Sequence, residues 1–107
     1  MNTLWNDRPD PQGIHFRYTP GHGYIVLSSA RLAAMPAVLK TSSRFYDAGS
    51  SYFEEDSEWA RVACAFPQYF TGQEQQNAQE TLAHYHPDIF LAWGKQGRPI
   101  AQTIEED

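Results

Sequence analysis

Residues 14–28 constrain the fold of this chain more than any other stretch. The apolar side chains of Ile14, Phe16 and Tyr18 alternate with polar ones, which is the period of two expected of a half-buried β-strand. The sequence PGHG at 20–23 then supplies the glycines of a chain reversal, and the run YIVL beyond it is β-branched and apolar. The pattern predicts an antiparallel hairpin with His22 at its tip.

Helical patterns follow the hairpin and are separated by prolines. Ser29 is predicted as the N-cap of a short helix that Pro36 interrupts. A longer helix is predicted from Ser51, because Ser51 and Glu54 fit the S-x-x-E capping box, and it would end at Pro67. Its core-facing stripe would contain Trp59, Val62, Ala63 and Phe66.

Two further helical segments are predicted in the second half of the chain. Thr71 and Glu74 form another capping box, and the apolar face behind them extends to about His84. Pro87 would start a short segment that ends at Gly94 or Gly97. We therefore expect an α+β fold in which an antiparallel hairpin of two to three strands packs against about three α-helices.

The length of 107 residues fits one hydrophobic core. We expect an irregular arm over 1–12, which Trp5 would dock on the body, a single domain over 13–98 and a frayed acidic tail over 99–107. The single cysteine, Cys64, excludes an intrachain disulfide and a cysteine-rich zinc site. No charged leader or membrane-length apolar run is present, so we expect a cytoplasmic protein. We also expect that it carries no cofactor.

Charge is distributed unevenly along the chain. Residues 1–46 carry five basic and two acidic residues, whereas residues 47–107 carry three basic and eleven acidic ones. Because affinity for nucleic acid depends largely on Lys and Arg, the second half is a poor candidate for gripping phosphates. A protein partner with a basic surface suits it better, although an acidic face can also serve solubility alone.

The acidic cluster in SSYFEEDSEWA is the strongest candidate for such a surface. The predicted partner-binding residues are Asp47, Glu54, Glu55, Asp56 and Glu58. On a helix these carboxylates would fan around the axis, and two neighbouring carboxylates seldom hold a divalent cation alone. We predict no catalytic residue and no metal ligand.

Two alternatives remain open. The first is a small metal-dependent or acid/base enzyme that combines the acids with His22, His84 or His86. The second is a weak nucleic-acid-binding module in the basic half, where aromatic rings and Arg side chains could stack bases. Its candidate residues are Arg8, Arg17, Arg31, Lys40 and Arg44, with Phe16, Tyr18, Phe45 and Tyr46. No G-x-S-x-G elbow or phosphate-binding loop occurs.

Three stretches together resemble a family of uncharacterised bacterial domains from phage, plasmid and other mobile-element contexts. They are PGHGYIVLSSARLAAMPAVL, YFEEDSEWARVACAFPQYF and AQETLAHYHPD, and the resemblance covers roughly residues 13–90. Ser57 stands where many members would have a cysteine, which implies a structural role for that position. The resemblance implies a mobile-element protein in a bacterial host cell, and no particular activity. Because the chain is small and acidic, this context favours a non-catalytic accessory factor, most concretely an anti-CRISPR-like inhibitor of a host defence system, over the enzyme that stays open as an alternative.

Overall fold

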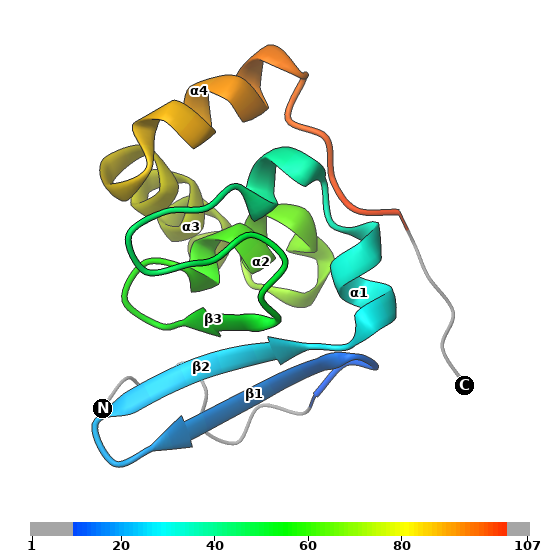
Figure 1. The fold of residues 1–107 in the computed structure, drawn as a ribbon, viewed down its shortest axis with the longest axis vertical. Coiled ribbons are helices and arrows are strands. Elements are labelled where there is room, and N and C mark those ends of the chain that lie inside the picture. Colours follow the sequence, from blue (N-terminus) through cyan, green and yellow to red (C-terminus); the bar gives the residue numbers. More distant parts are fainter. Residues whose placement is uncertain (1–9, 103–107) are drawn as a thin grey trace.

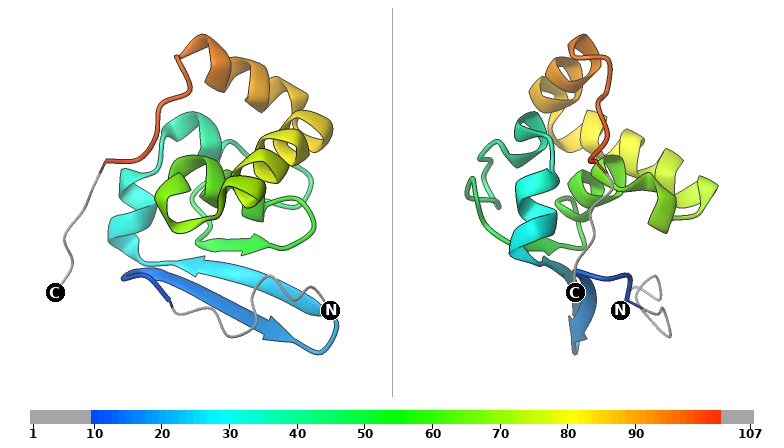
Figure 2. Two further views of the ribbon diagram at one scale, coloured as in Figure 1. Left: turned by 180° about the vertical axis from the view of Figure 1, so that it is seen from behind. Right: turned by 90° about the vertical axis from the view of Figure 1, so that its right-hand side faces the viewer.

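The computed structural model describes residues 10–102 and shows an α+β fold. Its antiparallel sheet has the strand order β1 (Ile14–Thr19), β2 (His22–Leu27) and β3 (Tyr52–Glu54). The helices are α1 (Ser29–Ala34), α2 (Trp59–Ala65), α3 (Gly72–Tyr85) and α4 (Pro87–Lys95), with 3₁₀ turns η2 (Ala37–Lys40) and η3 (Pro67–Tyr69). The helices lie on the same side of the sheet (Figures 1 and 2). The expected fold class is therefore confirmed.

The predicted hairpin forms, with its turn at Pro20 and Gly21. Thr19 pairs with His22, so His22 is the first residue of β2 rather than the tip of the turn. Gly21 has a φ of 94°, which a side chain would strain. Tyr18 is 54% exposed although its position in the alternation predicts burial. It lies near the turn, where the hairpin projects away from the helices (Figure 1).

The helix α1 begins one residue earlier than predicted. Ser28 is the N-cap, because its backbone is extended and its hydroxyl accepts a hydrogen bond from the Arg31 N–H at 3.1 Å. The helix ends at Ala34, and Met35 is extended, as the residue before a proline usually is. Pro36 thus separates α1 from η2.

The prediction of a helix from Ser51 is wrong. Residues 52–54 form β3, which pairs Tyr52 with Val26 and Glu54 with Tyr24. The Ser51 carbonyl accepts from the Leu27 N–H, which extends the ladder in place of the expected capping box. Helix α2 starts only at Trp59, after a turn.

Helix α2 forms the centre of the core. All seven of its residues are buried, and the predicted stripe of Trp59, Val62, Ala63 and Phe66 is buried as expected. The sheet contributes Ile14, Phe16, Ile25, Leu27 and Phe53 to this core, whereas α3 and α4 contribute Ala78, Leu82, Ile89 and Trp93. The core therefore lies between the inner face of the sheet and the later helices.

The capping box at the start of α3 is confirmed. Thr71 Oγ1 accepts from the Glu74 N–H at 3.1 Å, and Glu74 Oε1 accepts from the Thr71 N–H at 2.8 Å. Tyr85 is the last residue of α3 and is 57% exposed. Helix α4 starts at Pro87 as predicted.

The chain after α4 returns to the core. The Ala101 N–H donates to the Ala65 carbonyl at 2.8 Å, and Trp93 Nε1 donates to the Pro99 carbonyl at 2.9 Å. These contacts hold residues 99–102, which we assigned to the tail, against α2 and α4. The predictions for Trp5, Arg8 and the terminal acids lie outside the described residues. Among residues 10–102, no helix has the length and apolar character needed to cross a membrane.

Candidate functional sites

Glu58 is the centre of a buried network of charged and polar side chains. Its Oε1 accepts from Arg61 Nε at 2.7 Å, and its Oε2 accepts from Ser57 Oγ at 2.7 Å and lies 3.0 Å from His86 Nε2. Burial acts to raise the pKa of the Glu58 carboxyl, but the Ser57 hydrogen bond, the Arg61 guanidinium and His86 together lower it. The carboxylate is therefore ionised and paired.

Arg61 extends this network to the loop before β3. Its Nη1 donates to the Leu39 and Thr41 carbonyls at 3.1 and 2.6 Å, and its guanidinium lies 4.4 Å from the centre of the Tyr46 ring. Glu58 and Arg61 are both fully buried. The network thus joins the start of α2 to the loop over 39–46 and, through His86, to the junction of α3 and α4.

Burial changes the role expected of Glu58. With an exposed fraction of 0%, it cannot present its carboxylate to a partner, so its expected place on an acidic surface is wrong. The expectation failed because an acid within an acidic run suggests solvent exposure, while its partners Ser57, Arg61 and His86 enclose it. Ser57 is itself buried and donates to the carboxylate.

The structure brings Glu54, Glu55 and Asp56 together at the end of β3. Glu55 Oε1 accepts from the Gly23 N–H at 2.7 Å, whereas Asp56 is exposed. Burial raises the pKa of the Glu54 carboxyl, and the charges of Asp56, Glu58 and Glu55 add to the increase, while His22 opposes it. Asp47, the fifth predicted acid, is exposed in the loop between η2 and β3.

Two tyrosines on the outer face of the sheet adjoin this acidic group. The rings of Tyr24 and Tyr52 are stacked, with centroids 5.5 Å apart and an interplanar angle of 17°. Glu54 is the strand partner of Tyr24 and lies on the same face as Tyr52, two residues along β3. Tyr52 is 61% exposed. Sequence reasoning missed this pair because it assigned Tyr52 to a helix; the signal was Phe53 facing inward between two outward-facing residues.

The three candidate histidines are in different environments. His22 starts β2 near Glu54, and the His84 ring on α3 packs against Tyr85, with centroids 4.6 Å apart. Of these three histidines, only His86 forms an ion pair with a carboxylate of the described residues; outside the three, His15 Nδ1 lies 3.5 Å from Asp10 Oδ2. The His86 side chain borders a cleft of about 270 Å³ between the 41–43 loop and the start of α4. Within residues 10–102, no group of three His, Cys, Asp or Glu side chains could hold a metal ion.

Three of the residues proposed for a basic and aromatic surface are buried. Phe16, Tyr46 and Arg31 are buried, and the Arg31 guanidinium packs over the Phe66 and Tyr69 rings. The other described cations have local contacts: Arg17 with Asp10, Lys40 with the Leu32 carbonyl and Arg44 with the Phe45 ring. The alternation of the strand predicts that Phe16 points inward. The burial of Arg31 and Tyr46 could not be predicted in this way, because it depends on contacts with residues distant in the sequence.

The only cysteine is not poised as a nucleophile. Cys64 is buried in α2, and burial raises the pKa of its thiol to about 12 even though Arg98 acts to lower it. The thiolate required for nucleophilic attack is therefore scarce at neutral pH.

Comparison with known proteins identifies one family. A family model described as a domain of unknown function, DUF7007, matches residues 10–107. No curated protein and no solved structure matches the chain.

Proposed function

The chain belongs to the DUF7007 family, a domain of unknown function, and we propose that it is a non-catalytic binding protein whose sheet docks a basic protein partner. The observation that carries this proposal is the stacked Tyr24–Tyr52 pair beside the Glu54 carboxylate on the outer face of the sheet. This face lies on the side of the sheet opposite the helices (Figure 1).

The chemistry of this face suits an arginine side chain. A guanidinium can stack on an aromatic ring while its N–H groups form a bidentate pair with a carboxylate. Tyr52 offers an exposed ring, and Glu54 offers a carboxylate on the same face. Burial raises the pKa of the Glu54 carboxyl, and the neighbouring negative charges of Asp56 and Glu58 raise it further, so an arriving cation relieves repulsion as it binds.

The remaining acids extend the surface at one end of the sheet. Glu55 is anchored to the hairpin through the Gly23 N–H, while Asp56 is exposed beside it. Such acids steer a basic partner and raise the association rate. The surface thus contains four of the features that recognition of a basic protein uses: a stacked aromatic pair, a nearby carboxylate, additional acids and a sheet face that lies opposite the helices of residues 10–102.

The resemblance to mobile-element domains suggests a biological setting for this binding. We propose that the protein is an accessory factor of a phage or plasmid that inhibits a host defence system, as anti-CRISPR proteins do. Defence proteins that bind nucleic acid present Lys and Arg, and an acidic surface can occupy such a site. The support for this setting is the charge of the surface together with the resemblance.

Titration with an arginine-rich peptide tests the binding surface. We expect the peptide to shift backbone amide resonances of β2 and β3 in NMR spectra, and a lysine peptide of the same length to bind more weakly because it stacks less well on Tyr52. The variants Tyr52→Ala and Glu54→Arg should each weaken binding at least tenfold.

Matched controls lie on another face. Tyr85 is similarly exposed and Glu80 is an exposed acid, both on α3, so Tyr85→Ala and Glu80→Arg change the same residue types away from the sheet. Equal losses of affinity in the control variants would show non-specific charge attraction and refute the assigned surface.

A second candidate function is acid/base catalysis at the cleft beside His86. The specific observation is that Glu58 contacts one ring nitrogen of His86, as a carboxylate does when it orients a catalytic histidine, while Ser43 Oγ on the cleft wall is buried without a hydrogen-bond partner. Covalent labelling of Ser43 by a fluorophosphonate, lost in His86→Gln, would support this candidate. Absence of labelling at any serine would exclude the serine-nucleophile form of it.

A further inference from the structure

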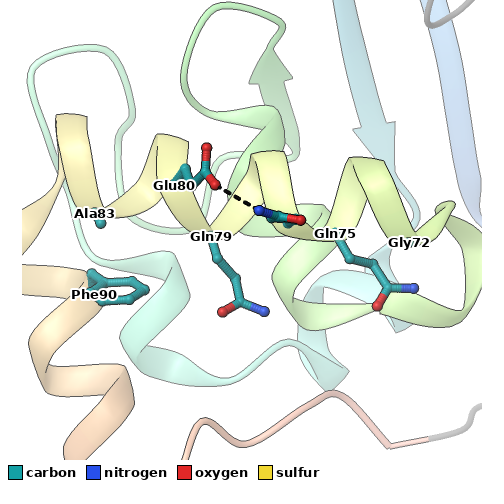
Figure 3. Close-up of a pocket in the computed structure, with 7 residues that line it drawn as sticks. Gly72, Gln75, Gln79, Glu80, Ala83 and Phe90 are labelled. Carbon is teal, nitrogen blue, oxygen red and sulfur yellow. Dashed lines mark hydrogen bonds between the residues drawn. The ribbon is translucent and has the colours of Figure 1, made fainter.

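We propose that the groove between α3 and α4 binds a carboxylate-bearing peptide segment of another protein, with Arg98 as the carboxylate-binding residue. Two adjoining hollows form this groove. The larger hollow has a volume of about 440 Å³ and is bordered by Gln75, Gln79 and Phe90. The smaller hollow, of about 190 Å³, is also bordered by Gln75 and Gln79, and its other lining residues include Arg98 and Ile100. Figure 3 shows the two glutamines extending from α3 on the side where Phe90 projects from α4.

The guanidinium of Arg98 is held in place without an acid. It lies 4.3 Å from the centre of the Phe90 ring and 5.5 Å from that of Trp93. No carboxylate within residues 10–102 forms an ion pair with it, and the side chain is exposed. Stacking fixes the plane of the guanidinium and leaves its N–H groups available to a carboxylate, which it can bind through two parallel hydrogen bonds.

The backbone at Arg98 is strained in a way that helix termination does not require. The end of α4 is a Schellman motif: the Gly97 N–H donates to the Gly94 carbonyl at 3.0 Å, and the Arg98 N–H donates to the Trp93 carbonyl at 2.7 Å. This motif needs a left-handed residue at Gly97, whose φ is 78°. Arg98 is also left-handed, with a φ of 49°, a conformation that costs free energy for a residue with a side chain. The left-handed backbone of Arg98 occurs together with a side chain that lies over the Phe90 ring.

The glutamines supply the polar groups that a peptide backbone needs. The side-chain amide nitrogen of Gln75 donates hydrogen bonds to the Pro67 and Phe70 carbonyls, so its side-chain oxygen remains available to accept a hydrogen bond from a ligand. Gln79 is exposed and can both donate and accept. The side-chain amides of the two glutamines can form hydrogen bonds with the backbone of an extended peptide. Arg98 can bind a carboxylate of that peptide, at its C-terminus or on a side chain, and Phe90 and Ile100 offer apolar surface to its other side chains.

Charge gives the bound peptide a direction. Glu80 borders the larger hollow, where it accepts a hydrogen bond from Gln76 at 3.1 Å (Figure 3), whereas Arg98 borders the smaller one. Its carboxylate would repel the acidic end of a ligand, whereas Arg98 attracts it. The carboxylate of the ligand is therefore expected next to Arg98.

Three synthetic hexapeptides of one apolar sequence test the proposal with the full-length protein. The first has a free C-terminal carboxylate, the second a C-terminal amide, and the third a C-terminal amide with an internal glutamate. We expect the first, the third or both to shift the side-chain amide resonances of Gln75 and Gln79 and the Arg98 Nε–H resonance, and the second to bind at least tenfold more weakly. Binding of the first alone identifies a C-terminal carboxylate, and binding of the third alone identifies an acidic side chain.

Variants distinguish a specific site from general charge attraction. Arg98→Lys keeps the charge but loses the bidentate geometry and should weaken binding at least tenfold, while Lys95→Gln removes a nearby exposed cation of α4 and should have little effect. Arg98→Gly accommodates the left-handed backbone and should abolish binding, with a thermal melt to show that the variant is folded. Unchanged binding in Arg98→Gly, equal losses in Lys95→Gln, or no binding of either carboxylate peptide at millimolar concentration would overturn the proposal.

Discussion

Replacement of Glu58 by glutamine tests whether the buried charge network stabilises the fold. The carboxylate is hydrogen-bonded to Ser57, Arg61 and His86. A glutamine has nearly the same shape, and its oxygen can still accept from Arg61, but its amide nitrogen cannot accept from Ser57 Oγ or His86 Nε2. The variant also leaves the fully buried Arg61 guanidinium without a counter-charge. Removing one partner of a buried ion pair costs about 3–5 kcal/mol, which is the loss we expect.

Urea unfolding followed by tryptophan fluorescence measures this loss. Domains of this kind have an unfolding free energy of about 5–15 kcal/mol, so the variant loses a large share of its stability. With a urea dependence of about 1–3 kcal/mol per M, the midpoint should fall by at least about 1 M. Asp56→Asn is the matched control, because it neutralises an exposed carboxylate two residues away and should change stability by less than about 0.5 kcal/mol. Coinciding midpoints for Glu58→Gln and Asp56→Asn would refute the stabilising role of the network.

The pH dependence of unfolding provides an independent check on Glu58. Folding lowers the pKa of this carboxyl from its ordinary value of 4.5, so the folded state favours the ionised form. Its stabilising contribution is present above pH 4.5 and is lost as the pH falls through the folded pKa. We expect the natural protein to lose stability more steeply on acidification below this pH than Glu58→Gln does. Parallel pH profiles would contradict the lowered pKa.

Three further predictions follow from single residues. Glu54→Gln should stabilise the protein near neutral pH. The pKa of Glu54 is raised in the folded state, so its ionised form opposes folding as the pH rises above 4.5, and urea unfolding at pH 7 measures the effect. Gly97→Ala should destabilise the protein by about 1–2 kcal/mol, since it places a side chain at a φ of 78°, and thermal unfolding would show it. Cys64 should resist iodoacetamide at pH 8 in the folded protein and react after unfolding in urea, as mass spectrometry would detect, because its thiol is buried and has a pKa of about 12.

Local signals in the sequence predicted the hairpin and the later helices correctly. The alternation at Ile14 and Phe16, the capping box at Thr71 and the proline at the start of α4 each depend on residues close together in the chain. Their physical causes are side-chain period, N–H capping and the fixed φ of proline. Such causes act within a few residues, so a single sequence is enough to identify them.

The region over 51–58 could not be predicted in the same way. Ser51 and Glu54 satisfy the capping-box pattern, but β3 is only three residues long, and an alternation over three residues cannot be distinguished from a helical turn. What decides the conformation is the pairing of β3 with β2, more than twenty residues earlier in the chain. The same holds for Glu58, because the spacing to Arg61 is visible in the sequence whereas His86 and the Leu39 carbonyl are not.

The two proposed surfaces should bind their ligands independently. The outer face of the sheet and the groove between α3 and α4 lie on different sides of the buried helix α2 (Figures 1 and 2). Coupling between distant sites requires an element with two arrangements that both ligands bias, and the burial of all seven residues of α2 opposes a second arrangement of this helix. We therefore expect Tyr52→Ala to leave the affinity for the carboxylate peptide unchanged and Arg98→Lys to leave that for the arginine-rich peptide unchanged. A change of more than about threefold in either cross-titration, or about 0.6 kcal/mol, would show that the fold couples the two surfaces.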